Sequence, residues 1–329
     1  MSGMTRLPVD DVAGALPEVI DVFIACASFE SRCLTLAEHI PGYKVRQAIL
    51  CENDSLASLT TEFSQRLTDR FANVVTRLVF RRNDPLDVAD KLQGALANVA
   101  GSGRVIFVDI TTFTHEALLI LVRLLQLYRR LDDRVYFGYT VATEYSVGAE
   151  GGDKWLSKGI SEIRSILGYP GENLPSRRVH LLILTGFETE RAAKLVDEFE
   201  PALVSLGFVT GADTDEIHQL SSRAFQQSFL EKYSSAEVFR FPCYDALATK
   251  DAILHQAHRF AEFNLVVAAM NTKISTVGAA LAAAEDDRIQ LCYAFANEYN
   301  YAGYSAPGTS CYVGDVTDLL AATATPRET

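Results

Sequence analysis

The feature that most constrains the fold is a set of three segments that recur in the same order in both halves of the chain. Each copy follows its partner by 154 to 160 residues, so one structural unit is predicted to occur twice. The shared Phe-Glu and Tyr-x-x-Ala-x-Glu-Tyr residues carry more weight than the apolar positions, because strand packing does not demand a glutamate there. The matching pairs are 24–30 with 182–188, 105–112 with 265–272, and 139–146 with 293–300.

Apolar runs alternate with helical patterns in each half, which is typical of βαβ units and a parallel sheet. The predicted class is therefore α/β, with two tandem Rossmann-like or flavodoxin-like units related by internal duplication. Residues 1–149 are expected to form the first unit, 150–177 a linker with a short helix near 154–167, and 178–329 the second unit. Strands are predicted near 20–26, 45–51, 75–80, 104–109, 134–139, 178–184, 206–210, 236–241, 264–269 and 289–295.

Composition excludes several classes of function. A net charge of −12 argues against a broad surface for duplex nucleic acid, which needs clustered Lys and Arg. The sequence contains neither a long apolar run nor a signal peptide, so we expect a cytoplasmic protein that does not enter a membrane. Cysteines and histidines show no metal-ligand spacing, and no dinucleotide or ATP-binding glycine motif is present. We therefore expect neither a metal nor a cofactor.

The recurring segments place polar residues where strands end, and ligands of open parallel sheets bind at that edge. Hydroxyl groups there can contact a phosphate, but the same geometry also caps a helix. Lys273 could supply positive charge or be an ordinary solvated lysine. The candidate ligand contacts are Ser28, Asp109, Thr111, Thr112, Thr114, Tyr145, Gly186, Asn271, Thr272, Lys273, Ser275, Thr276, Tyr299 and Tyr304.

Two further sets of residues are candidates at the same edge. Glu144 and Glu298 each precede a tyrosine, so the carboxylate could accept from ribose hydroxyls while the ring stacks on a base. Both could equally cap the next segment. The segment 300–308 is rich in Gly, Pro, Asn and Tyr, and we expect a loop that covers a pocket.

The fourth-strand loops Asp109-Ile-Thr-Thr-Phe-Thr114 and Asn271-Thr272-Lys273 resemble the D-x-T-x-G-T-K stretch of CRISPR-associated Rossmann-fold (CARF) sensors. Two such units in one chain resemble the SAVED sensors of prokaryotic antiphage systems. The resemblance implies a cyclic oligonucleotide or related messenger bound in a cleft between the halves. Its contacts would be Thr111, Thr112, Asn271, Thr272 and Lys273.

This sequence departs from the family pattern at two places. The glycine before Thr-Lys is absent in both copies, and Phe113 stands where the first copy would have its lysine. The two repeats use nearly the whole chain, so the nuclease or protease that such sensors usually carry is expected to be a separate effector protein.

Three functions are compatible with these observations. The leading hypothesis is a sensor or adaptor that binds a small anionic nucleotide, without turnover, in prokaryotic defence or stress signalling. An alternative is an enzyme that cleaves a phosphodiester or N-glycosidic bond with a carboxylate pair, Glu30 with Glu144 or Glu188 with Glu298. A third possibility is a non-catalytic subunit of a larger complex.

Overall fold

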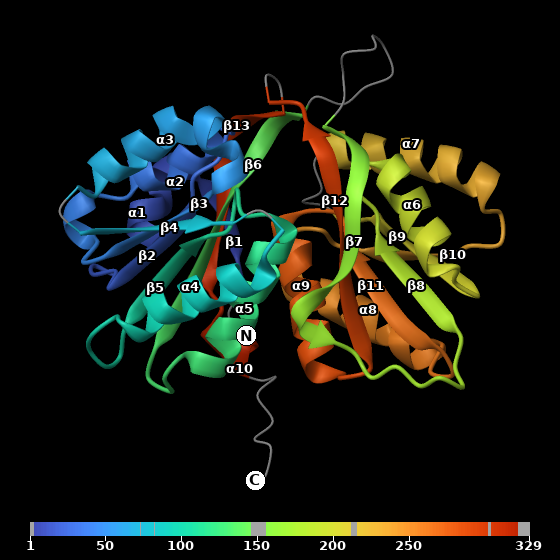
Figure 1. Ribbon diagram of the computed structural model, residues 1–329. Coiled ribbons are helices and arrows are strands. Elements are labelled where there is room, and N and C mark those ends of the chain that lie inside the picture. The colour runs from blue at the N-terminus through green and yellow to red at the C-terminus, as the bar shows by residue number, and fades with distance from the viewer. Residues whose placement is uncertain are drawn as a thin grey trace. The chain divides into compact units, whose positions relative to one another are not determined.

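The chain is an α/β protein made of two compact units (Figure 1). The computed structural model describes residues 3–72, 74–81, 83–145, 156–211, 216–301 and 304–321. Unit 1 comprises Met1–Tyr145 and Ser305–Thr329, and unit 2 comprises Ser146–Tyr304. Each unit has its own mostly parallel sheet, which confirms the predicted fold class. None of the helices in these described ranges combines the length and apolar character that a membrane span requires.

Unit 1 contains a seven-stranded sheet in the order β1-β13-β6-β5-β2-β3-β4. The strands from β6 to β4 are parallel, whereas β13 runs antiparallel to β6 and to β1. Every residue of β2 is buried, as expected for a parallel strand covered on both faces. The strands are β1 (Thr5–Pro8), β2 (Val22–Cys26), β3 (Ala48–Asn53), β4 (Val75–Phe80), β5 (Val105–Asp109), β6 (Arg134–Tyr145) and β13 (Ser305–Asp315).

Helices of unit 1 cover both faces of this sheet: α1–α3 lie on one face, and α4 and α5 lie on the other (Figure 1). Asp84 caps α4 by accepting from the Asp87 amide at 3.0 Å, with Pro85 at the first helical position. The helices are α1 (Val12–Ala15), α2 (Arg32–His39), α3 (Ala57–Arg70), α4 (Pro85–Ala97), α5 (His115–Tyr128) and α10 (Thr317–Ala321).

Unit 2 contains a six-stranded sheet in the order β10-β9-β8-β11-β12-β7. All neighbouring strands are parallel except β7, which is antiparallel to β12. The helices α6 and α7 lie on one face, and α8 and α9 lie on the other (Figure 1). Its elements are β7 (Ser157–Pro170), β8 (Val179–Leu184), α6 (Thr189–Phe199), β9 (Leu203–Val209), α7 (Glu216–Lys232), β10 (Glu237–Phe241), α8 (Ala246–Arg259), β11 (Asn264–Ala269), α9 (Lys273–Glu285) and β12 (Ile289–Tyr299).

The five parallel strands have the same order in both units. Numbered along the chain within each unit, both sheets read 3-2-1-4-5, so the order reverses between β2 and β5 in unit 1 and between β8 and β11 in unit 2. All ten predicted strands are present. Each sheet then gains an antiparallel strand beside its fifth strand, β13 in unit 1 and β7 in unit 2.

The two antiparallel strands are exchanged between the units along the chain. The segment after β6 supplies β7 to unit 2, and the segment after β12 supplies β13 to unit 1. The observed bounds therefore differ from those predicted, because 305–321 belong to the first unit and not to the second. Ser305–Gly308 form the start of β13 and not a covering loop. Residues 150–155 and 302–303 of the predicted linker and loop lie outside the described residues.

The helix predicted near 154–167 is wrong, because Ser157–Pro170 form strand β7. Two register shifts along the pairing with β12 insert extra residues into the strand, one of them between Ile160 and Glu162. In the sequence, Ile160, Ile163 and Ile166 recur every third residue. That spacing imitates the apolar face of a helix, although the backbone is extended.

The strand exchange makes a prediction about truncation. Removing residues 305–329 takes β13 from unit 1, which leaves β1 without a partner and β6 paired only with β5, whereas unit 2 keeps all of its strands. Limited proteolysis followed by mass spectrometry should show rapid cleavage within 1–145 and a protected fragment near 157–301. Cleavage concentrated in 178–301 would instead support the division predicted from sequence.

Candidate ligand-binding site at the carboxyl ends of the strands

The predicted ligand contacts lie at the edge where the central parallel strands end. β2 and β5 pair in unit 1, and β8 and β11 pair in unit 2, so the loops that follow these strands are neighbours within each unit. These pairs flank the point where the strand order reverses, which is the usual ligand site of open α/β sheets. The structure therefore brings together 28–30 with 109–114 in one unit, and 185–188 with 270–273 in the other.

In unit 1, the threonine hydroxyls of this edge are used by the fold. Thr111 is buried, donates its hydroxyl to Asp109, and accepts from the Thr140 amide at 2.9 Å. Thr112 donates to the Cys26 carbonyl at 2.6 Å, and Thr114 caps α5. The capping interpretation thus holds for Thr114, and the other two hydroxyls hold the β5 loop against neighbouring strands.

Ser28 of the same edge also has an internal role. It is buried, and its hydroxyl accepts from the Glu30 amide at 3.3 Å, which shapes the turn between β2 and α2. No hydroxyl of this set lies exposed at the edge. The unit 1 edge consequently offers a ligand little beyond backbone groups and the half-buried Thr112 and Thr114.

The hydroxyls of unit 2 are also occupied. Thr272 caps α9 by accepting from the Ser275 amide at 3.1 Å, and it donates to the Cys243 carbonyl. Ser275 and Thr276 are wholly buried and donate to the Thr272 carbonyl at 2.8 and 3.0 Å. These three residues build the first turn of α9, where no ligand can reach their hydroxyls.

Three other residues of the unit 2 edge remain suited to a ligand. Gly186, in the loop after β8, lies very close to the loop after β11. A Cβ atom added to Gly186 would lie 1.9 Å from the Met270 carbonyl oxygen. Asn271 donates to the Thr185 carbonyl and is half-buried, which joins the two loops. Lys273, also half-buried, is the first residue of α9 and places a positive charge beside its N-terminal amides.

The Phe-Glu glutamate of unit 1 is part of a buried cluster. The guanidinium of Arg32 donates to Glu30 from Nη2 at 2.6 Å and from Nε at 3.0 Å, and to the Thr140 carbonyl at 3.2 Å. Ser305, the first residue of β13, donates to the same carboxylate at 2.5 Å. Arg32 also lies 5.5 Å from the Tyr145 ring centroid. The cluster therefore joins α2, β6 and β13.

Unit 2 contains the same cluster at matching positions. Arg191 donates to Glu188 and to the Ala294 carbonyl, and it lies 5.1 Å from the Tyr293 ring centroid. Ser157, the first residue of β7, donates to Glu188. Ser157 is in register with Tyr299, as Ser305 is with Tyr145. Arg32 and Arg191 thus each form an ion pair with little exposure to solvent.

The glutamates that were candidates for catalytic carboxylate pairs differ in their exposure to solvent. Glu144 and Glu298 are exposed near the ends of β6 and β12, whereas Glu30 is buried under Arg32. The Tyr145 hydroxyl has a pKa well above its usual value, because the side chain is buried and lies beside Tyr139. Tyr304 lies 6.3 Å from Tyr299, ring to ring. In the described residues, no cluster of side chains is placed to hold a metal ion.

Asp109 differs from the other acidic residues of this edge. Its side chain is 1% exposed, and Oδ2 has no hydrogen-bond partner, while Oδ1 accepts from the Thr111 amide at 3.0 Å. Burial raises the pKa of the Asp109 carboxyl to about 7, although hydrogen bonds from Thr111 and the charge of Arg32 lower it. Such a buried group acts on the loop, not on a ligand.

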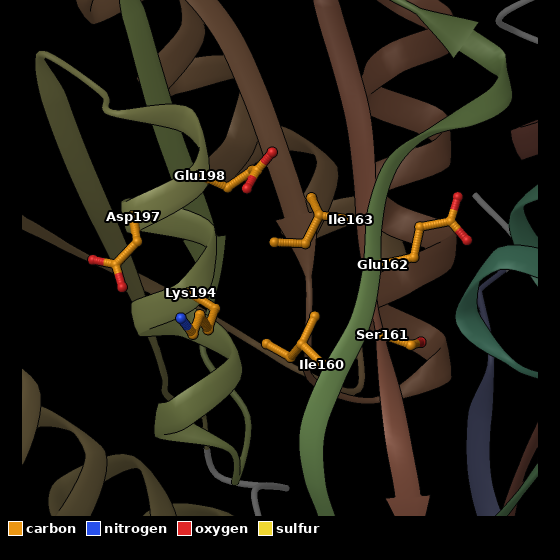
Figure 2. A pocket seen from close by; sticks show the side chains of 7 residues that line it. All are labelled: Ile160, Ser161, Glu162, Ile163, Lys194, Asp197 and Glu198. Carbon is orange, nitrogen blue, oxygen red and sulfur yellow. The ribbon is translucent and has the colours of Figure 1, made fainter.

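A hollow of about 400 Å³ in unit 2 lies between α6 and β7 (Figure 2). Figure 2 shows Ile160 and Ile163 directed toward α6, whereas Ser161 and Glu162 point to the other side of the strand. Among the described lining residues on the α6 side, Lys194 is accompanied by two carboxylates, Asp197 and Glu198. This excess of acidic groups disfavours a nucleotide phosphate here.

Comparison with known proteins finds similar folds among solved structures but does not assign this chain to a family. No protein-family model matches the chain, and no curated protein sequence is similar to it. A type III CRISPR defence DNA nuclease activated by cyclic oligoadenylate is similar in structure, with 10% identity, a TM-score of 0.49, and coverage of 87% of this chain and 67% of the nuclease. The cytoplasmic domain of a prokaryotic cation chloride cotransporter covers 86% of this chain and 99% of its own, with 10% identity and a TM-score of 0.26. Values this low carry no argument about ligand or activity.

The raised pKa of Asp109 predicts a pH-dependent stability. Because the folded pKa exceeds the unfolded value of 3.8, the folded state holds the extra proton between that value and about 7. The stabilisation is complete below about pH 4 and is lost as the pH rises to about 7, by at most roughly 1.4 kcal/mol per pH unit. Asp109→Asn should flatten this part of the profile in urea unfolding from pH 4 to 8. Parallel profiles for the variant and the parent would contradict the prediction.

The buried ion pairs predict a second stability effect. Arg32→Met and Arg191→Met each leave a carboxylate without its guanidinium, so each should lower the free energy of unfolding by about 3–5 kcal/mol. Arg66→Met is the matched control, because the Arg66–Glu38 pair is exposed and should cost about 1 kcal/mol or less. Chemical unfolding that ranks Arg66→Met with the other two would show that burial of these pairs is unimportant.

Proposed function

We propose that this chain binds a small anionic nucleotide at the carboxyl edge of the unit 2 sheet. The observation that supports the proposal is the placement of Lys273 and Asn271 beside the β8 loop, at the point where the strand order reverses. Because Gly186 has no side chain, the backbones of the β8 and β11 loops can approach each other closely. A positive charge at the N-terminus of a helix suits phosphate oxygens, and Asn271 holds the two loops together beside it.

The corresponding edge of unit 1 lacks the same chemistry. Phe113, which the sequence pattern aligned with the lysine, is 1% exposed and packs into the fold, but the helix caps align it with Asn271 instead. Thr114 occupies the capping position that Thr272 occupies in unit 2, and His115 follows it in place of Lys273. We infer one anion-binding edge and one edge that serves the structure.

Binding without turnover is the better-supported role for this edge. A general acid or base must reach the proton it transfers. The carboxylates of Glu30 and Glu188 are instead held by Arg32 and Arg191 and by a serine hydroxyl each. The proposed role is therefore a sensor or adaptor that passes a nucleotide signal to an effector protein, in prokaryotic defence or stress signalling. Of the CARF-like loop residues, Lys273 and the neighbouring Asn271 support that assignment.

The test is a ligand screen of the purified chain by thermal shift and mass spectrometry. Cyclic oligoadenylates, NAD and ADP-ribose are compared, and we expect at least one to raise the melting temperature with its mass unchanged. Lys273→Ala should abolish the shift, because it removes the charge. Arg259→Gln is the control, since it removes a positive charge from α8 that pairs with Glu237 outside this edge.

Two results would overturn the proposal. A change in ligand mass that disappears in Glu298→Gln would establish an enzyme. A shift that survives Lys273→Ala would place the ligand elsewhere.

A further inference from the structure

A second hollow of unit 2 lies at the carboxyl end of β9, with a volume of about 350 Å³. Its wall combines the loop Val209–Gly211, one face of α7 and a side chain of β10. The polar side chains that face it are Gln219, Ser222, Arg223 and Gln226 from α7, Thr210 from the loop and Arg240 from β10. It is distinct from the Lys273 edge, which follows β8 and β11.

The charge of this hollow is unusual for an acidic chain. Arg223 and Arg240 line it, no carboxylate is among its lining residues, and neither guanidinium forms an ion pair within the described ranges. Eleven other arginines of those ranges pair with an acidic side chain. Two guanidinium groups thus share one concave surface, and none of its described lining residues is acidic.

In unit 1, the corresponding region between the second and third parallel strands is occupied by an internal ion pair. There, Arg77 of β4 donates to Glu52 of β3 at 2.8 Å and 3.0 Å, and Ser64 of α3 donates to the same carboxylate at 2.8 Å. An internal carboxylate thus neutralises the arginine between the second and third strands. In unit 2, the strand β9 supplies Phe208 and Val209 instead, so no carboxylate from that strand meets Arg240.

We infer that this hollow is an anion pocket that receives the phosphate group of a small phosphorylated ligand. Guanidinium groups bind phosphate oxygens through paired N–H donors, and two of them from separate elements can hold one phosphate from two sides. The amides of Gln219 and Gln226 supply further donors. The volume lies within the range of small-ligand sites. The assignment does not depend on nucleotide binding at Lys273, because it rests on other residues.

The test uses the full chain with inorganic phosphate and with AMP, titrated by calorimetry at a constant ionic strength set with sodium chloride. Both probes should bind, and Arg223→Gln and Arg240→Gln should each weaken binding about tenfold, because each removes one charged hydrogen-bonding group. Both side chains are exposed, so the variants should retain the parent melting temperature.

Two control variants separate this pocket from other sources of affinity. Arg259→Gln removes one positive charge from α8 of the same unit and should leave both affinities unchanged, as should Lys273→Ala. Loss of phosphate binding in Lys273→Ala alone would assign the affinity to the other edge and overturn the inference. Equal weakening in Arg259→Gln, or heats no larger than those of chloride, would also overturn it.

Discussion

The buried pairing of Arg32 with Glu30, and of Arg191 with Glu188, is the interaction on which both units depend. Each guanidinium also binds a carbonyl of the fifth parallel strand, and each carboxylate accepts from the first residue of the exchanged strand. The cost of burying these charges is offset only while all partners are present. The ion pair therefore determines where β13 and β7 begin, and it fixes the first-strand loop at the same time.

Much of this architecture could be predicted from the sequence, because parallel strands are buried on both faces and read as apolar runs. The recurrent Phe-Glu and Glu-Tyr segments located the two clusters, although their role in packing was not evident. Strand β7 could not be recognised, since Ile160, Ile163 and Ile166 have a helical spacing in the sequence and register shifts interrupt the alternation expected of a strand. Strand β13 was hidden for another reason: its partner β6 is distant in sequence.

The candidate site was predicted less well than the fold. Threonine at the start of a helix presents the same hydroxyl to an amide as to a phosphate, so the sequence cannot separate a cap from a contact. Thr114, Thr272 and their neighbours proved to be structural. The arginines Arg223 and Arg240 could not be found from sequence at all, because no motif surrounds them and only the fold brings α7 and β10 to one hollow.

The strand exchange has a consequence for how the protein is made. Ser305 lies 275 residues from Glu30, so the unit 1 sheet cannot be completed until nearly the whole chain has left the ribosome. All strands of unit 2 are synthesised before β13, and until then one edge of β6 is unpaired. Contacts of such long sequence separation slow folding and expose strands to aggregation. The unit whose first strands are synthesised earliest is thus completed only after all strands of the other unit.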